Sequence, residues 1–68
     1  MPPKISLEAA RVNAGFNQKE AAKALNVTPS TLRNWEIGKT LPSIERAQEI
    51  AELYRYPVGY IFFGKRSL

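Results

Sequence analysis

One short segment, residues 28–36, concentrates hydrogen-bonding side chains whose geometry suits molecular recognition. If this segment is a helix, Leu32 and Trp35 define its inner side at a spacing of three residues. The outer side then presents Thr28, Pro29, Ser30, Arg33 and Asn34. Arginine offers a planar fork of N–H donors, and asparagine offers donors and an acceptor in one plane. These two groups match the edges of guanine and adenine, each of which can take a pair of hydrogen bonds.

Residues suited to catalysis are scarce in this chain. Histidine, cysteine and aspartate are all absent, so serine and threonine have no evident base and no metal cluster is expected. Glu45, Glu49 and Glu52 recur at helical spacing and are interpreted as a solvated surface. We therefore expect a protein that is not an enzyme and that needs neither a cofactor nor a metal. No small-molecule ligand is indicated.

The chain is basic, with ten Lys and Arg residues against six Glu, a net charge of +4 and a pI near 9.8. Three of the four net charges lie in residues 1–42, which favours a polyanionic partner such as nucleic acid. No apolar run approaches the roughly 18 residues of a membrane span, and the N-terminus lacks the pattern of a signal peptide. A cytoplasmic protein without a membrane segment is expected.

The length of the chain, 68 residues, allows one domain. A domain of this size buries only about 60% of the surface that its unfolded chain exposes, and disulfides cannot add stability because cysteine is absent. We expect a single domain over residues 1–68, with an ordered core of about 5–63 and short tails. Helix packing or oligomerisation must then supply its stability.

Caps and turn residues divide the chain into five predicted helices, and no segment shows the alternation of a strand. N-caps are predicted at Ser6, Asn17, Thr28 and Ser43, and Pro57 opens a short last helix. Only a tight turn through Asn26 and Val27 separates the second helix from the third, which is the form of a helix-turn-helix unit. The fourth helix has a predicted buried stripe of Ile44, Ala47, Ile50, Ala51 and Tyr54.

An ordered motif runs through these elements: Arg11-x3-Gly15-x2-Gln18-x2-Ala21-Ala22-x2-Leu25-x-Val27-Thr28-x3-Leu32-x2-Trp35-Glu36-x-Gly38-Lys39-x2-Pro42. In these residues the chain resembles the Cro and phage-repressor helix-turn-helix family, also called XRE-like. The resemblance covers roughly residues 5–63. It implies an all-α, compact, five-helix, lambda-repressor-like DNA-binding domain with the helix-turn-helix at its second and third helices.

The resemblance also implies which residues contact DNA. The base-contacting positions fall on Thr28, Pro29, Ser30, Arg33 and Asn34. Arg33 suits guanine, Asn34 suits adenine, and Pro29 could pack on a thymine methyl group or serve only to start the helix. A phosphate contact or a solvated surface charge remains the alternative for Arg33.

Phosphate contacts and a structural ion pair complete the implied site. The resemblance places a phosphate-binding glutamine at Gln18, at the first turn of a helix where an anion is favoured. Further phosphate candidates are Asn17, Lys19, Thr31, Lys39 and Thr40, although Lys19 is equally consistent with a solvated face. Arg11 and Glu36 are implied to form an ion pair that ties the first helix to the end of the third.

The C-terminal region is rich in aromatic residues, more than one short helix can easily bury. We expect part of this surface to form a symmetric homodimer, in line with the family, through Tyr56, Val58, Tyr60, Phe62 and Phe63. The alternative is that the aromatic residues only complete the core of the monomer. A two-fold dimer would present two reading helices about 34–36 Å apart and would require a pseudo-palindromic DNA site.

The resemblance implies a small transcriptional regulator of a prokaryotic cell or phage-infected host, and we expect a Cro-like repressor of an operator. Because 68 residues leave no room for an effector-binding domain, a stand-alone regulator is expected over a ligand-switched one. A controller protein or an isolated DNA-binding domain are alternatives. The main rival from another class is a protein-interaction or antitoxin-like accessory factor that uses the same fold, with DNA binding secondary.

Overall fold

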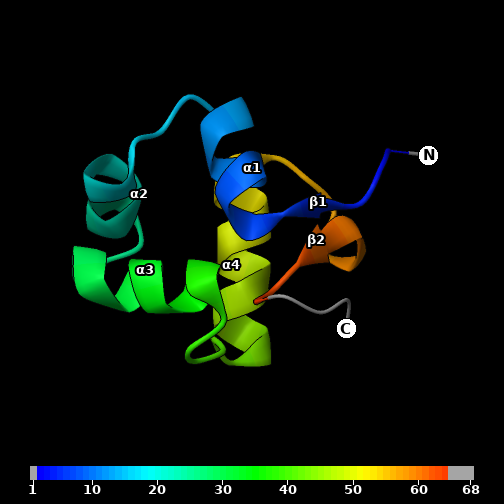
Figure 1. Cartoon of the computed structure of the whole chain (residues 1–68). Helices are drawn as coiled ribbons and strands as arrows, with labels where there is room; N and C mark the ends of the chain where they lie inside the picture. Colours follow the sequence, from blue (N-terminus) through cyan, green and yellow to red (C-terminus); the bar gives the residue numbers. More distant parts are fainter. Residues whose placement is uncertain (1, 65–68) are drawn as a thin grey trace.

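The computed structural model describes residues 2–64, so the basic tail at Lys65 and Arg66 lies outside the described residues. Four α-helices are present in this part of the chain: α1 (Leu7–Asn13), α2 (Gln18–Ala24), α3 (Pro29–Ile37) and α4 (Ile44–Tyr54). They are accompanied by a 3-10 turn, η1 (Val58–Tyr60), and by two short strands, β1 (Ile5–Ser6) and β2 (Ile61–Phe62). In Figure 1, α2 and α3 lie on one side of α4, and the two strands lie on the other.

The prediction of a fifth helix was wrong, and so was the prediction that no strand is present. Residues 58–60 form one 3-10 turn, after which β2 runs parallel to β1 with Ile5 opposite Ile61. The local sequence explains the change, because Gly59 weakens a helix and β-branched and aromatic residues such as Ile61 favour extended backbone. The pairing joins the two ends of the described chain.

The predicted N-caps are confirmed. Ser6, Asn17, Thr28 and Ser43 each accept a hydrogen bond from the backbone amide three residues further on. In return, the Asn17 amide donates to the Glu20 carboxylate, which completes the capping box. These bonds satisfy amides that would otherwise have no partner at the start of a helix, so each helix begins directly after its cap residue.

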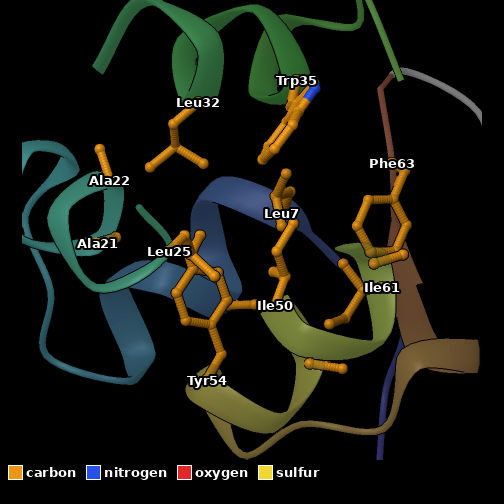
Figure 2. Packing of buried hydrophobic residues seen from close by; sticks show 13 residues of the cluster. Leu7, Ala21, Ala22, Leu25, Leu32, Trp35, Ile50, Tyr54, Ile61 and Phe63 are labelled. Carbon is orange, nitrogen blue, oxygen red and sulfur yellow. The ribbon is translucent and has the colours of Figure 1, made fainter. Parts of the chain in front are cut away.

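The core lies where α1, α3 and α4 meet (Figure 2). Its largest fully buried side chains are Leu7, Leu32 and Ile50. Ala21 and Ala22 are buried on α2, where their small size allows α3 to pack closely. The predicted stripe of α4 is correct except at Ile44, which is 80% exposed because it occupies the first turn and projects beyond the core. None of the helices in residues 2–64 is long and apolar enough to cross a membrane.

Candidate nucleic-acid interface

Helix α3 has an inner and an outer face, as the sequence predicts. Leu32 and Trp35 are buried and project from α3 toward Leu7 and Ile50 (Figure 2). The residues expected to contact bases lie on the other side: Thr28, Pro29, Ser30 and Arg33 are exposed, and Asn34 is partly buried. All five are thus at least partly accessible to a partner, four of them on α3 and Thr28 at its N-cap. We refer to α3 as the recognition helix and to these five residues as its outer face.

The turn before the recognition helix is tightly held. Asn26 has a φ of 59°, a left-handed conformation that asparagine tolerates better than most residues. The next amide, that of Val27, donates to the Ala22 carbonyl at 2.9 Å. Because only Asn26 and Val27 lie between the C-cap of α2, Leu25, and the N-cap of α3, Thr28, the direction of α3 relative to α2 is set locally.

The end of the recognition helix is held by a buried polar group, Glu36. Arg11 Nε donates to Glu36 Oε2 at 2.8 Å, and the two side chains are 10% and 5% exposed. Arg11 Nη1 also donates to the Phe16 carbonyl at 3.0 Å. Gln18 Nε2 donates to Glu36 Oε1 at 3.0 Å. Glu36 thus joins α3 to both α1 and α2, which places the start of α2 beside the recognition helix.

The bond between Gln18 and Glu36 was not predicted from the sequence. It occupies one N–H of the Gln18 side-chain amide, and an amide nitrogen carries a second. The side chain is partly buried and its orientation is fixed by Glu36, so the second donor is held in a defined direction. A glutamine at the start of a helix followed by a glutamate on the recognition helix is the only signal that could have suggested this contact.

Capping limits what two of the polar residues near the outer face can offer. Thr28 Oγ1 accepts from the Thr31 amide at 3.1 Å and lies 2.9 Å from Thr31 Oγ1. The two hydroxyls therefore satisfy each other in part, and the Thr28 methyl group remains for contact with a partner. By contrast, the side chains of Ser30 and Arg33 make no hydrogen bond or ion pair with the residues that the structure describes.

The expected phosphate contacts lie at two places beside α3. Asn17 and Lys19 are exposed at the start of α2, where the Asn17 side chain also serves as the cap. Lys39 and Thr40 are exposed just after α3, and their amides donate to the Asn34 carbonyl at 2.9 and 3.3 Å. Since those amides are already bonded, the side chains are the groups that can reach a phosphate.

The sequence of the chain also matches a known family. The profile of the helix-turn-helix family matches residues 7–61, most of the chain. The chain belongs to the helix-turn-helix family. Membership supports DNA binding in transcriptional regulation as the function of this domain.

Two relatives of the helix-turn-helix domain are known regulators. Repressor protein CI of Enterobacteria phage phi80 is 36% identical over 53 residues, which is 78% of this chain and 22% of that protein. The HTH-type transcriptional regulator ImmR of Bacillus subtilis strain 168 is 34% identical over 55 residues, which is 81% of this chain and 43% of that protein. The chain therefore spans less than half the length of either relative. No solved structure matches it.

The aromatic C-terminal region of the helix-turn-helix domain is only partly available to a second copy. Phe63, expected in a dimer interface, is 2% exposed and belongs to the core, because β2 turns it inward. Tyr56 donates its hydroxyl to the Pro3 carbonyl, and Lys4 Nζ lies 5.8 Å from the centroid of the Phe62 ring. Val58 is 40% exposed, and Tyr60 is partly buried.

Tyr54 is a buried polar residue that sequence reasoning assigned only to the apolar stripe. Its ring packs against Phe16 with a centroid distance of 6.0 Å, and its hydroxyl is buried without a hydrogen-bond partner in the described residues. Burial, and to a smaller extent the negative charge of Glu36, raise the pKa of Tyr54 to about 12. Tyr54 therefore stays neutral beside the polar group that holds the recognition helix.

Proposed function

We propose that the domain binds double-stranded DNA sequence-specifically and acts as a Cro-like transcriptional repressor. The observation that carries this proposal is the outer face of α3, which presents polar side chains while Glu36 holds the helix through two hydrogen-bonded partners. Both relatives named above are regulators, and one is named a repressor. The family favours a DNA-binding regulator over an enzyme.

The outer face supports base readout centred on Ser30, Arg33 and Asn34. Arg33 is exposed and is free to form a bidentate contact with guanine O6 and N7, and the Asn34 amide suits adenine. Pro29 and the Thr28 methyl group supply apolar contacts of the kind that a thymine methyl group takes. Each good bidentate contact contributes roughly 1–3 kcal/mol of discrimination between base pairs.

Two groups of residues beside α3 would bind the DNA phosphates on either side of the major groove. Gln18, aimed by Glu36, is the central member of the first group, with Asn17 and Lys19 next to it in the chain. The second group is Lys39 and Thr40, and Thr31 lies on the recognition helix between them. Such contacts set the register of the protein on DNA without carrying sequence information.

A homodimer on a pseudo-palindromic operator is part of the proposal. Val58 offers exposed apolar surface and lines a groove of about 290 Å³ together with Gln48, Ala51, Glu52, Tyr56 and Pro57. With Phe63 buried, Tyr56, Val58, Tyr60 and Phe62 remain as the residues proposed to contact the second copy. Sedimentation over a concentration series, with and without a two-half-site duplex, tests this, and a strict monomer on that duplex would contradict it.

Selection of bound sequences from randomised DNA tests the function itself, followed by titrations at several salt concentrations. Arg33→Ala should relax the preference at one base pair. Lys39→Ala should weaken binding to all duplexes alike. It should also reduce the slope of log affinity against log salt concentration by about one, the loss of one phosphate contact. Lys23→Ala removes an exposed lysine that is not among the residues proposed to bind phosphate, so it is the control for loss of one positive charge. If no sequence is enriched even at low salt, the proposal fails and the protein-interaction alternative gains support.

A further inference from the structure

Arg46 makes an unusual link between α4 and the helix-turn-helix. It is the third residue of α4, where the positive end of the helix dipole disfavours a cation. Its Nη1 donates to the Leu25 carbonyl at 2.8 Å, across 21 positions of sequence, and to Glu49 Oε1 at 3.2 Å. Its side chain is 32% exposed, so its guanidinium is drawn partly into the protein by these contacts.

The Leu25 carbonyl is at a critical place for the recognition helix. Leu25 is the C-cap of α2 and is followed at once by Asn26 and Val27, the residues of the turn. The last carbonyls of a helix have no partner within it, and a cation is favoured at this negative end of the dipole. Arg46 supplies both the hydrogen bond and the charge, from a helix that belongs to neither half of the helix-turn-helix.

The two ends of the recognition helix are therefore held by different arginines. Arg11 holds the C-terminal end of α3 through its ion pair with Glu36. Arg46 holds the turn from which α3 starts, close to the outer face that would read DNA. A charge-assisted bond at a two-residue turn restricts the angle at which the following helix leaves it.

We propose that Arg46 is a positioning residue, which acts through the Leu25 carbonyl to set the angle at which α3 enters the DNA. This inference rests on the proposed DNA-binding function. Loss of the bond should leave the domain folded but let the recognition helix tilt, so base contacts suffer while phosphate contacts persist. The ratio of specific to non-specific affinity is then the property that Arg46 controls.

Arg46→Met, which keeps an unbranched stem and removes both bonds, is the main variant. The probes are the duplex selected by the wild-type chain and a scrambled duplex of the same composition, measured where circular dichroism shows each protein fully folded. We expect the affinity ratio to fall about tenfold, within the range of one base contact. Exchange of the Val27 amide should accelerate relative to amides of α1, because the turn opens locally.

Glu49→Gln is the matched control, since it removes the ion pair of Arg46 and leaves the bond to Leu25 available. It should keep the wild-type affinity ratio, and an equal loss in this variant would overturn the inference. Arg46→Lys keeps the charge but is one bond shorter, so it should lose part of the discrimination. If Arg46→Met does not fold, the affinity ratio of Arg46→Lys tests the inference instead.

Three results separate the possible roles. An unchanged affinity ratio in the folded Arg46 variants would overturn the inference and leave Arg46 with a purely structural role. A salt slope lowered by about one in Arg46→Met would mark Arg46 as a phosphate contact and would also overturn it. If the wild-type chain itself selects no sequence, the proposed function fails, which is a different outcome from wild-type discrimination that Arg46 does not affect.

Discussion

Replacing Arg11 with methionine should remove a large part of the stability of the domain. The Arg11 and Glu36 side chains are 10% and 5% exposed with their atoms 2.8 Å apart, so solvent screens the pair little. Methionine keeps an aliphatic stem but leaves the buried Glu36 carboxylate with only the Gln18 amide. Breaking one side of such a pair costs about 3–5 kcal/mol. At about 0.05–0.15 kcal/mol per residue, a chain of 68 residues has roughly 3–10 kcal/mol in total.

Urea unfolding followed by the fluorescence of Trp35 measures this loss. Trp35 is the one tryptophan of the chain, is 8% exposed and directly precedes Glu36, so its emission reports on the packing of α3. With a slope of about 1 kcal/mol per molar urea, the midpoint should fall by about 3 M or more, or the variant should be unfolded without urea.

Glu8→Gln is the matched control because Glu8 pairs with the same arginine but differs in exposure. Arg11 Nη2 and Glu8 Oε2 are 3.7 Å apart and the Glu8 side chain is 67% exposed. The control should therefore lose less than about 1 kcal/mol of unfolding free energy. The double variant Arg11→Met with Glu36→Leu should recover part of the loss, because no unpaired charge stays buried. A loss below about 1 kcal/mol in Arg11→Met, or equal losses in the variant and its control, would refute the reasoning.

Substitutions at three further positions test other features of the fold. Arg55, the C-cap of α4, has a φ of 57°, so Arg55→Gly should raise the thermal midpoint through a gain of about 0.5–1 kcal/mol, and a loss would contradict strain there. Ser43→Ala should cost about 1 kcal/mol in urea unfolding because it removes the cap of α4, whereas Ser43→Thr should keep most of it. Because the folded pKa of Tyr54 is raised from 10.0 to about 12, the unfolded chain loses this proton first, and stability should fall between about pH 10 and 12. Urea titrations across that range should show a fall of about 2–3 kcal/mol in the wild type that is absent from Tyr54→Phe.

The helix starts could be predicted from the sequence because the interactions that set them are local. Each cap bond joins residues three positions apart, as between Asn17 and Glu20, so the pattern is visible in a window of four residues. The same holds for the left-handed conformation of Asn26, which follows from the short connection between two helical patterns. The outer face of α3 also follows from local periodicity once Leu32 and Trp35 are assigned to the core.

Contacts between distant segments could not be predicted in the same way. The strand pair exists because Ile61 meets Ile5, and neither two-residue strand carries a recognisable alternation by itself. The spacing of Arg46 and Glu49 indicates only a solvated ion pair, since the acceptor at Leu25 is a backbone carbonyl that leaves no trace in the residue types. Similarly, the exposure of Ile44 depends on where α4 starts relative to the core, which its helical period does not reveal.

The two faces of α3 connect stability and recognition differently, and this determines which positions can change. Ser30 and Arg33 are exposed, and their side chains make no hydrogen bond or ion pair within residues 2–64, so substitution there can alter DNA preference with little effect on folding. Thr28 belongs to both functions, because its hydroxyl caps the helix that its methyl group helps to present. Glu36 is the opposite case, since it fixes α3 through Arg11 and orients the side chain of Gln18. A new specificity is therefore more accessible through Ser30 and Arg33 than through the residues that hold the helix in place.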